Sequence, residues 1–285
     1  MIPAAFDYHA PTTVEEALRL LSEAGDDAKI IAGGQSLLPV LRLRLAAPEV
    51  VIDLAKIDSL RGVRDDGEVI VIGAMTSHHD VTHDPIIAEH ARLLTEAVHT
   101  VADPQVRHRG TFGGACVHAD PASDIPGPAL ALGAEFVIVG PGGQRTVAAP
   151  DFFQDLFTTA VGEDEILTEV RIPKHTGWGA AYEKFVRVAH QWAIVAVAAT
   201  VRVEGDRIGE AKLALTNMGS TPVRPMAAEQ ALIGVPLDAT SIGQALASIA
   251  DGTFPPTDIN GDQEYRRHLA PILARRAMLA AAGRQ

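Results

Sequence analysis

Cysteine is nearly absent from this sequence, since Cys116 is the only one among 285 residues. A single thiol excludes an internal disulfide framework and any cysteine-rich zinc or iron–sulfur site within the chain, and it is typical of the reducing cytoplasm. Long apolar runs are also missing, because the longest, around residues 192–201, is too short to span a bilayer. The first residues lack the basic and apolar regions of an export signal. We therefore expect a cytoplasmic protein without a transmembrane segment.

Basic residues are the minority among the charged side chains. The chain has 24 lysines and arginines against 36 aspartates and glutamates, which gives a formal net charge of −12. A nucleic-acid partner would require a clustered basic face, so we expect none. Hydrophobic residues make up 47% of the chain, enough for packed cores rather than disorder. The length allows two or three compact units.

The first predicted unit spans residues 1–57. Thr13 and Glu16 form a capping box at the start of a helix that Gly25 ends. Further elements are expected as a strand at 29–31, a short helix at 37–45 and a strand at 50–54.

The second predicted unit spans residues 58–175. It contains a strand at 69–73 and a long amphipathic helix at 85–101, whose apolar residues recur at helical spacing. Two more strands are expected at 136–139 and 166–172, followed by a linker at 173–177.

The third predicted unit spans residues 176–285. We expect strands at 182–188, 194–203 and 212–216, with a hairpin turn at 204–206, and helices at 227–232 and 264–282. The arginines of the last helix are interpreted as solvated or interface charges; these are Arg266, Arg267, Arg275 and Arg276.

Two glycine pairs carry the clearest functional signal. Gly33-Gly34 follows a strand and precedes Ser36, while Gly113-Gly114 follows Thr111. A diphosphate needs many N–H donors and little side-chain bulk, which bare glycine backbone and flanking hydroxyls supply. Neither pair fits the GxGxxG or the GxxxxGK[ST] pattern, so neither a Rossmann fold nor a P-loop is predicted. For each pair taken alone, a simple turn is the favoured interpretation.

Together, the two segments resemble the signatures of the FAD-binding medium subunits of molybdenum hydroxylases, the family that includes xanthine dehydrogenase. Within that family the likeness is greatest to the medium chain of aerobic, molybdenum-dependent carbon monoxide dehydrogenase. The likeness extends over nearly the whole chain, through Phe6-Asp7-Tyr8, Ala32 to Pro39, Val51-Ile52-Asp53-Leu54, Ile72-Gly73-Ala74-Met75-Thr76, the second glycine segment, Glu165-Ile166-Leu167, Ile172-Pro173, Tyr182-Glu183-Lys184-Phe185 and Tyr265 to Pro271.

The resemblance implies an α+β fold. Two small α/β subdomains would form a FAD-binding domain of the PCMH type, followed by a C-terminal domain with an antiparallel sheet and helices. It also implies a set of cofactor-binding residues: Lys29, Ile30, Ile31, Ala32, Gly33, Gly34, Gln35, Ser36, Leu37, Val101, Ala102, Thr111, Gly113, Gly114, His118, Ala119, Asp124, Leu167, Lys184 and Trp192.

The resemblance assigns roles to several of these positions. Residues 30–37 would wrap the diphosphate, and Thr111 with the second glycine pair and Asp124 would hold the linking chain. Leu167 would lie against the adenine. Lys184 would lie near the flavin ring and stabilise the anionic reduced form, and Trp192 would lie beside the isoalloxazine. Ordinary alternatives are an exposed lysine at 184, a turn cap at Asp124 and a core tryptophan at 192.

Two further features are assigned no chemistry. His78, His79 and His83 lie near Asp80 and Asp84, but no third ligand at characteristic spacing follows, so we predict no metal site. Cys116 is interpreted as a small packed side chain, because no base assembles a nucleophile around it. We predict no catalytic acid, base or nucleophile.

The implied function is electron transfer through FAD within a larger enzyme. Two-iron two-sulfur clusters in a small partner subunit and a molybdenum cofactor in a large one would complete a dimer of heterotrimers, and a quinone or another acceptor would take the electrons. The expected place is the cytoplasm, with a peripheral position at the inner membrane face as an option. Cys116 replaces the more usual Asn or Ser, and Gln35 stands where carbon monoxide dehydrogenases often have His. Two alternatives stay open: a hydroxylase of N-heterocycles or aldehydes, and a flavin-free scaffold subunit.

Overall fold

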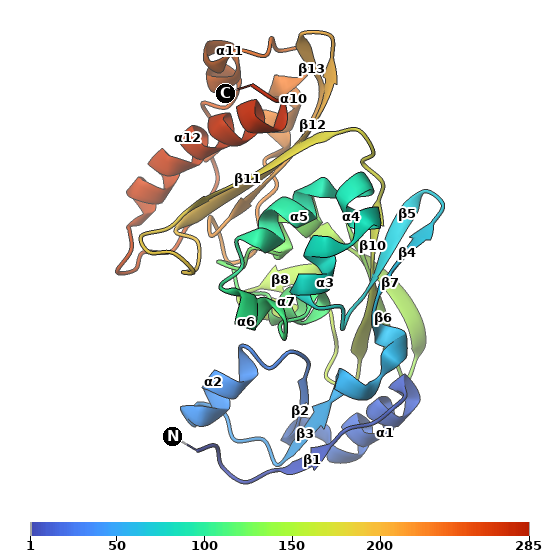
Figure 1. Ribbon diagram of the computed structural model, residues 1–285. Helices are drawn as coiled ribbons and strands as arrows, with labels where there is room; N and C mark the ends of the chain where they lie inside the picture. The colour runs from blue at the N-terminus through green and yellow to red at the C-terminus, as the bar shows by residue number, and fades with distance from the viewer. Residues whose placement is uncertain (1, 285) are drawn as a thin grey trace.

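The first sheet of the computed structural model, which describes residues 2–284, is small and parallel. Its strands are β1 (Asp7–His9), β2 (Ala28–Ile31) and β3 (Val50–Asp53), in the order β1-β3-β2. Helix α1 (Val14–Ala24) packs its buried Ala17 and Leu21 against this sheet. The expected cap is present, because Thr13 Oγ1 accepts a hydrogen bond from the Glu16 N–H (3.1 Å). Helix α2 (Leu37–Arg42) follows β2 and extends away from the sheet, in the lower part of Figure 1.

The second sheet has five antiparallel strands. They are ordered β4-β5-β10-β6-β7, so β10 (Ile166–Pro173) lies at the centre. Its Val170 is paired with Ile72 of β5 on one side and with Phe136 of β6 on the other, and all three are enclosed. The remaining strands of this unit are β4 (Val63–Asp66), β5 (Val69–Gly73), β6 (Glu135–Gly140), β7 (Gly143–Ala148), and the small pair β8 (Phe153–Asp155) and β9 (Thr158–Thr159).

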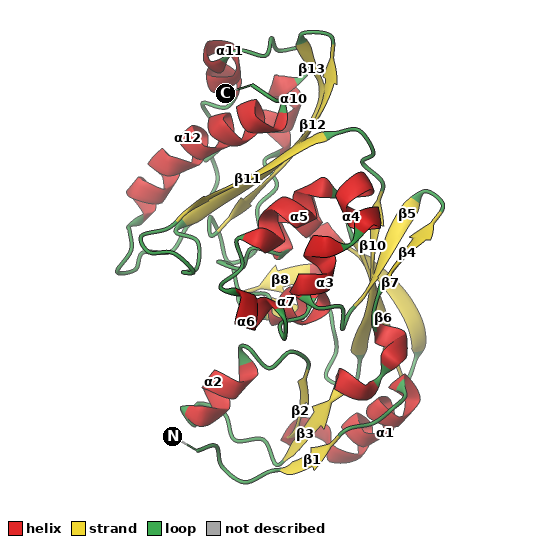
Figure 2. Cartoon of the chain, in the orientation of Figure 1, coloured by secondary structure: helices red, strands yellow, loops and turns green. Residues whose placement is uncertain are grey.

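A group of short helices covers this sheet and joins it to the next layer, as Figure 2 shows. They are α3 (His78–His83), α4 (Pro85–His90), α5 (Arg92–His99), α6 (Pro104–Arg107), α7 (Phe112–His118), α8 (Pro126–Ala131) and α9 (Ala149–Phe152). Three short 3₁₀ turns occur earlier in the chain, at Gly25–Asp27, Leu54–Lys56 and Asp58–Leu60.

The third sheet is an antiparallel meander of β11 (Gly179–Phe185), β12 (Val195–Glu204) and β13 (Arg207–Thr216). Side chains alternate across it: Ala198 faces the core of the second unit, whereas Val197 and Ala199 face the helices of the third. Those helices are α10 (Met226–Leu232), α11 (Ala239–Ala245) and α12 (Gln263–Ala281). The sheet is therefore buried on both faces. No helix in residues 2–284 has the length and apolarity needed to cross a membrane.

The structure confirms the α+β fold and the hairpin at residues 204–206, but one predicted helix is wrong. Residues 85–101 form two helices, because Ala91 leaves helical geometry (φ −144°, ψ 47°) and α5 ends at His99. The carbonyl of His90 accepts a hydrogen bond from the His175 N–H (2.7 Å). The chain turns at the enclosed Ala91, and the apolar pattern continues through the break because both helices pack buried residues into the same core.

Two other expectations also differ from the structure. The second glycine segment lies in the first turn of helix α7 and is not an isolated turn. Arg266 is fully enclosed instead of solvated: it pairs with Asp258 (2.7 Å) and donates to the carbonyl of Ile194. Through these two contacts Arg266 links the beginning of α12 to the residue just before β12. Its charge is therefore paired inside the fold and does not face solvent. Arg275 and Arg276 are exposed, as expected.

Candidate functional site

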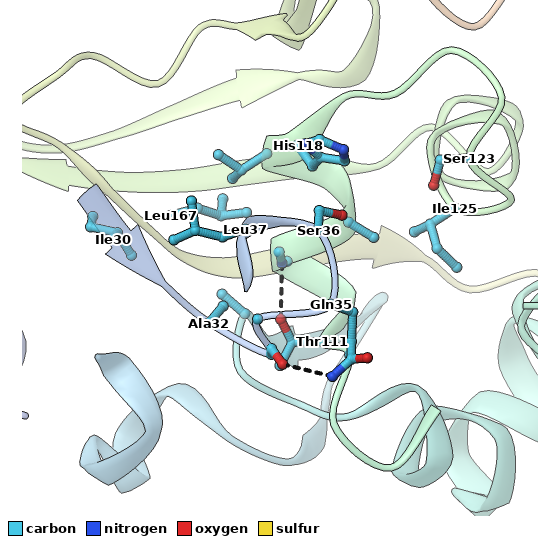
Figure 3. Close-up of a pocket in the computed structure, with 18 of the residues that line it drawn as sticks. Ile30, Ala32, Gln35, Ser36, Leu37, Thr111, His118, Ser123, Ile125 and Leu167 are labelled. Atoms are coloured by element: carbon cyan, nitrogen blue, oxygen red, sulfur yellow. Dashed lines mark hydrogen bonds between the residues drawn. The ribbon is translucent and has the colours of Figure 1, made fainter. Parts of the chain in front are cut away.

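A cavity of about 790 Å³ is lined by residues of all three larger sheets and of the segments beside them. Its wall includes β2 and the segment after it, the start of α7, β10, and the loop that contains Trp192. Figure 3 shows side chains of β2, the segment after it, α7 and β10 around the same space. The volume is within the range of cofactor sites.

Nearly all of the predicted site residues line this cavity. The exceptions are Ile31 and Ala119, which are not part of the wall. The ordinary alternatives do not hold: the side chain of Lys184 is only 8% exposed, Trp192 is 56% exposed, and Asp124 caps no helix but binds other side chains. The structure therefore brings the two glycine segments to one place.

The first glycine segment supplies free hydrogen-bond donors. The backbone N–H groups of Gly33 through Ser36 have no acceptor within the described part of the chain, nor does the Ser36 hydroxyl form a hydrogen bond there. Gly34 has a positive φ of 73°, a conformation that favours glycine. The Gln35 amide turns back and donates to the carbonyl of Gly33 (3.1 Å). Successive free N–H groups of this kind are what an anionic diphosphate requires.

The second glycine segment uses its donors internally. Gly113 donates to the carbonyl of Ala74 (2.9 Å), and Gly114 donates to Thr111 Oγ1 (3.2 Å), which caps α7. The idea that both segments offer equivalent N–H groups to a ligand is therefore wrong. This segment contributes a wall and the Thr111 hydroxyl, because its backbone is committed to folding.

The glycines also permit close packing between protein segments. A Cβ on Gly33 would overlap the carbonyl oxygen of Arg109 and lie 2.7 Å from the Cα of Gly110. A Cβ on Gly113 would lie 2.6 Å from the Cβ of Ala74. Small residues at these positions thus bring the two segments together, in addition to leaving room for a ligand.

A buried polar group lies at another part of the wall. Lys184 Nζ is 2.7 Å from Asp124 Oδ2 and donates to the carbonyl of Thr100 (3.1 Å), while the Tyr182 hydroxyl donates to Asp124 Oδ1 (2.9 Å). Burial raises the pKa of Asp124 to about 6, and the Lys184 and Tyr182 contacts oppose that change. Because Asp124 already compensates the ammonium, Lys184 presents less net charge to the cavity than an isolated lysine would.

Sequence reasoning missed several cavity residues. His190 has a positive φ of 67° and donates from Nδ1 to the carbonyl of Ala102 (2.6 Å), which joins two segments of the wall. His78, Met75 and Ile125 also line it. No pattern identified these residues, although the position of His190 beside Trp192 was an available clue.

Comparison with known proteins places these features in a family. Residues 4–175 match the FAD binding domain in molybdopterin dehydrogenase, and residues 180–281 match the CO dehydrogenase flavoprotein C-terminal domain. The chain belongs to this family. It is the FAD-binding medium subunit of an oxidoreductase of the molybdenum hydroxylase family, of the carbon monoxide dehydrogenase type.

Relatives with different activities match over nearly their full length. The carbon monoxide dehydrogenase medium chain of Hydrogenophaga pseudoflava is 41% identical, covering 99% of this chain and 98% of the relative. The glyceraldehyde dehydrogenase medium chain of Sulfolobus acidocaldarius is 35% identical, covering 97% of this chain and 98% of the relative.

Solved structures agree with the fold. Carbon monoxide dehydrogenase from Hydrogenophaga pseudoflava has a TM-score of 0.96 at 42% identity, covering 99% of both chains. Quinoline 2-oxidoreductase from Pseudomonas putida 86 has a TM-score of 0.94 at 33% identity, also covering 99% of both chains. Members with different substrates thus share this architecture.

Proposed function

We propose that this chain carries electrons through FAD in a carbon monoxide dehydrogenase. Electrons from carbon monoxide oxidation at molybdenum in a large subunit would pass through two-iron two-sulfur clusters of a small subunit, reach FAD here and leave to a quinone or another acceptor. The assembly would be a dimer of heterotrimers in the cytoplasm, where a place at the inner membrane face would suit a quinone acceptor. The three units proposed for this chain are 1–57, 58–175 and 176–285.

The observation that carries the proposal is the run of N–H groups from Gly33 to Ser36 at the wall of the cavity, which have no acceptor in the described part of the chain. The chain also belongs to a family of FAD-binding domains. These groups would hold the diphosphate without a side-chain cation. Bound FAD supplies two-electron and one-electron redox chemistry. Leu167, which is 4% exposed, offers an apolar surface for the adenine, and Trp192, which is 56% exposed, is the aromatic that would lie beside the ring system.

Side-chain chemistry at Cys116 plays no part in this function. The thiol is fully enclosed, and burial raises its pKa, so a nucleophilic thiolate does not form there. The protein groups bind and orient the cofactor and set its surroundings, while substrate bonds break in a partner subunit.

The test is purification of the intact complex that contains this chain, with analysis of flavin, iron and molybdenum. We expect one FAD per copy of this chain and loss of the oxidised flavin absorbance when carbon monoxide is added without oxygen. A matched sample that carries a FAD-free variant of this chain should still reduce its iron–sulfur clusters. A complex whose flavin stays oxidised while its clusters are reduced would contradict the electron path.

A second candidate is a hydroxylase of aldehydes or N-heterocycles. It is favoured by relatives at similar identity, including the nicotine 6-hydroxylase medium subunit of Paenarthrobacter nicotinovorans at 36%. Flavin reduction by an aldehyde or quinoline, and not by carbon monoxide, would select this candidate. A colourless complex that FAD cannot reconstitute would instead indicate a scaffold subunit.

A further inference from the structure

His78 is a buried histidine on the wall of the cavity. It is the first residue of α3, which begins after the Ser77 cap, and only 4% of its surface is exposed. Burial lowers the pKa of His78 to about 4, and the nearby Arg107 acts in the same direction. The ring is therefore neutral at pH 7, with one nitrogen that donates and one that accepts.

Neither ring nitrogen of His78 has a hydrogen-bond partner in the part of the chain that the structure describes. Nδ1 is completely enclosed, whereas Nε2 is not among the enclosed atoms. Buried polar atoms are normally paired, because an unpaired one loses its hydration without compensation. Because Nδ1 is enclosed, Nε2 is the only ring nitrogen that a cofactor in the cavity can reach and supply with a partner.

The position of the His78 ring is fixed by Gly110, the residue directly before the second glycine segment. The His78 N–H donates to the carbonyl of Gly110 (2.9 Å). A Cβ on Gly110 would lie 2.8 Å from His78 Cδ2 and 3.2 Å from His78 Nε2, so the ring packs on bare glycine backbone. Gly33 packs against the same Gly110. The imidazole thus belongs to the contact region where the two glycine segments meet.

We infer that His78 is a further cofactor-binding residue, which donates a hydrogen bond from Nε2 to an oxygen atom of bound FAD near Gly110. The proton belongs on Nε2, since an enclosed N–H at Nδ1 would have no acceptor. The inference rests on the FAD binding of the proposed function. It adds a side-chain donor to a site whose other free donors, at Gly33 to Ser36, are backbone groups.

The experiment compares His78→Leu, His78→Gln and His78→Asn in the full chain after FAD removal. FAD dissociation constants come from flavin fluorescence, and melting of the FAD-free proteins checks the fold. We expect His78→Leu to bind FAD about tenfold more weakly, the factor that corresponds to one hydrogen bond. His78→Gln should recover most of this loss, because its amide nitrogen reaches the place of Nε2, and His78→Asn should not. His83→Leu, at an exposed histidine of the same helix, is the control and should bind normally.

The inference is overturned if His78→Leu binds FAD as tightly as the wild type, or if the Gln and Asn variants are equally weak, which would indicate packing alone. If His78→Leu does not fold, the comparison of Gln with Asn decides the question. A wild-type chain that does not bind FAD would instead contradict the proposed function itself.

Discussion

At the scale of single residues, the site depends on what is missing as much as on what is present. Gly33 has no Cβ, and a Cβ there would collide with the backbone of Arg109 and Gly110. The positive charge of Lys184 is balanced by the carboxylate of Asp124. Substitutions at these positions therefore change packing and charge balance together with cofactor binding.

Gly33→Ala should lower the free energy of unfolding by about 1–3 kcal/mol, the usual cost of overpacking, and should weaken FAD binding because the two glycine segments separate. Gly142→Ala is the matched control: its Cβ would meet nothing within 4 Å and its φ is not left-handed. That variant should stay within about 0.5 kcal/mol of the wild type. Denaturant unfolding measures both, and equal stability of the two variants would contradict the packing role of Gly33.

Lys184→Met should leave Asp124 buried without its cation, and we expect a loss of about 3 kcal/mol at pH 7. Asp124 would then take up a proton on folding, since its pKa in the folded chain already exceeds the ordinary value and would rise further. A group with a raised folded pKa makes the folded state more stable as the pH falls. The variant should accordingly regain stability between pH 7 and 5, and Asp124→Asn in the same background should remove that pH dependence. A flat profile in the single variant would exclude an ionised Asp124–Lys184 pair.

The lowered pKa of His78 should make the stability change with pH in the opposite direction, so that stability falls as the pH falls. Its pKa is about 4 in the folded chain against 6.5 for an unperturbed histidine, so the unfolded chain binds the proton first as the pH falls. The contribution is complete above pH 6.5 and is lost toward pH 4, with a span on the order of 3 kcal/mol. Unfolding free energies of the wild type and His78→Leu, taken across this range, should converge as the pH falls. Parallel curves would show that the imidazole is not kept neutral by folding.

At the scale of elements, short helices with specific caps position the site. Helix α7 begins with Thr111, whose Oγ1 accepts from Gly114, and it lies against the central sheet beside the first glycine segment. Helices α4 and α5 carry one continuous amphipathic pattern across a break at Ala91. Periodicity therefore identified the buried side of this region but could not locate the turn.

Thr111→Val should remove the cap of α7 and destabilise the protein by about 1 kcal/mol, because the Gly114 N–H loses its acceptor while the side-chain volume is kept. Thr111→Ser retains the hydroxyl and should remain close to the wild type. The comparison uses denaturant midpoints for stability and flavin fluorescence for FAD affinity. Identical midpoints for Val and Ser would mean that the cap contributes nothing.

At the scale of the whole molecule, the cavity forms where residues of three different sheets come together. Residues 28–30 belong to β2 of the first sheet and residues 32–37 follow it. Leu167 belongs to β10 of the second sheet, Lys184 to β11 of the third, and Trp192 to the loop between β11 and β12. A ligand that contacts all of them stabilises their arrangement, because it binds the folded chain and not the unfolded one.

FAD should therefore raise the melting temperature of the FAD-free chain in a concentration-dependent way. At a free FAD concentration 100 times the dissociation constant, the stabilisation should be about 2.7 kcal/mol, or several degrees. Scanning calorimetry across a FAD series measures it, with riboflavin as the comparison that lacks the diphosphate. Equal shifts of the melting temperature with FAD and with riboflavin at the same concentration would contradict a binding role for Gly33 to Ser36.

Local patterns in the sequence determined the elements that depend on neighbouring residues: the capped helix α1, the hairpin at residues 204–206 and the last helix. The resemblance of the two glycine segments to the family signatures indicated FAD as the cofactor. Most of the cavity wall followed from that resemblance as well. Only the tertiary structure decided that Gly113 and Gly114 use their donors internally, that Lys184 is paired with Asp124, that Arg266 is buried, and that His78 is left without a partner. The physical reason is that hydrogen-bond satisfaction and burial depend on groups brought together from distant parts of the chain, which no local pattern records.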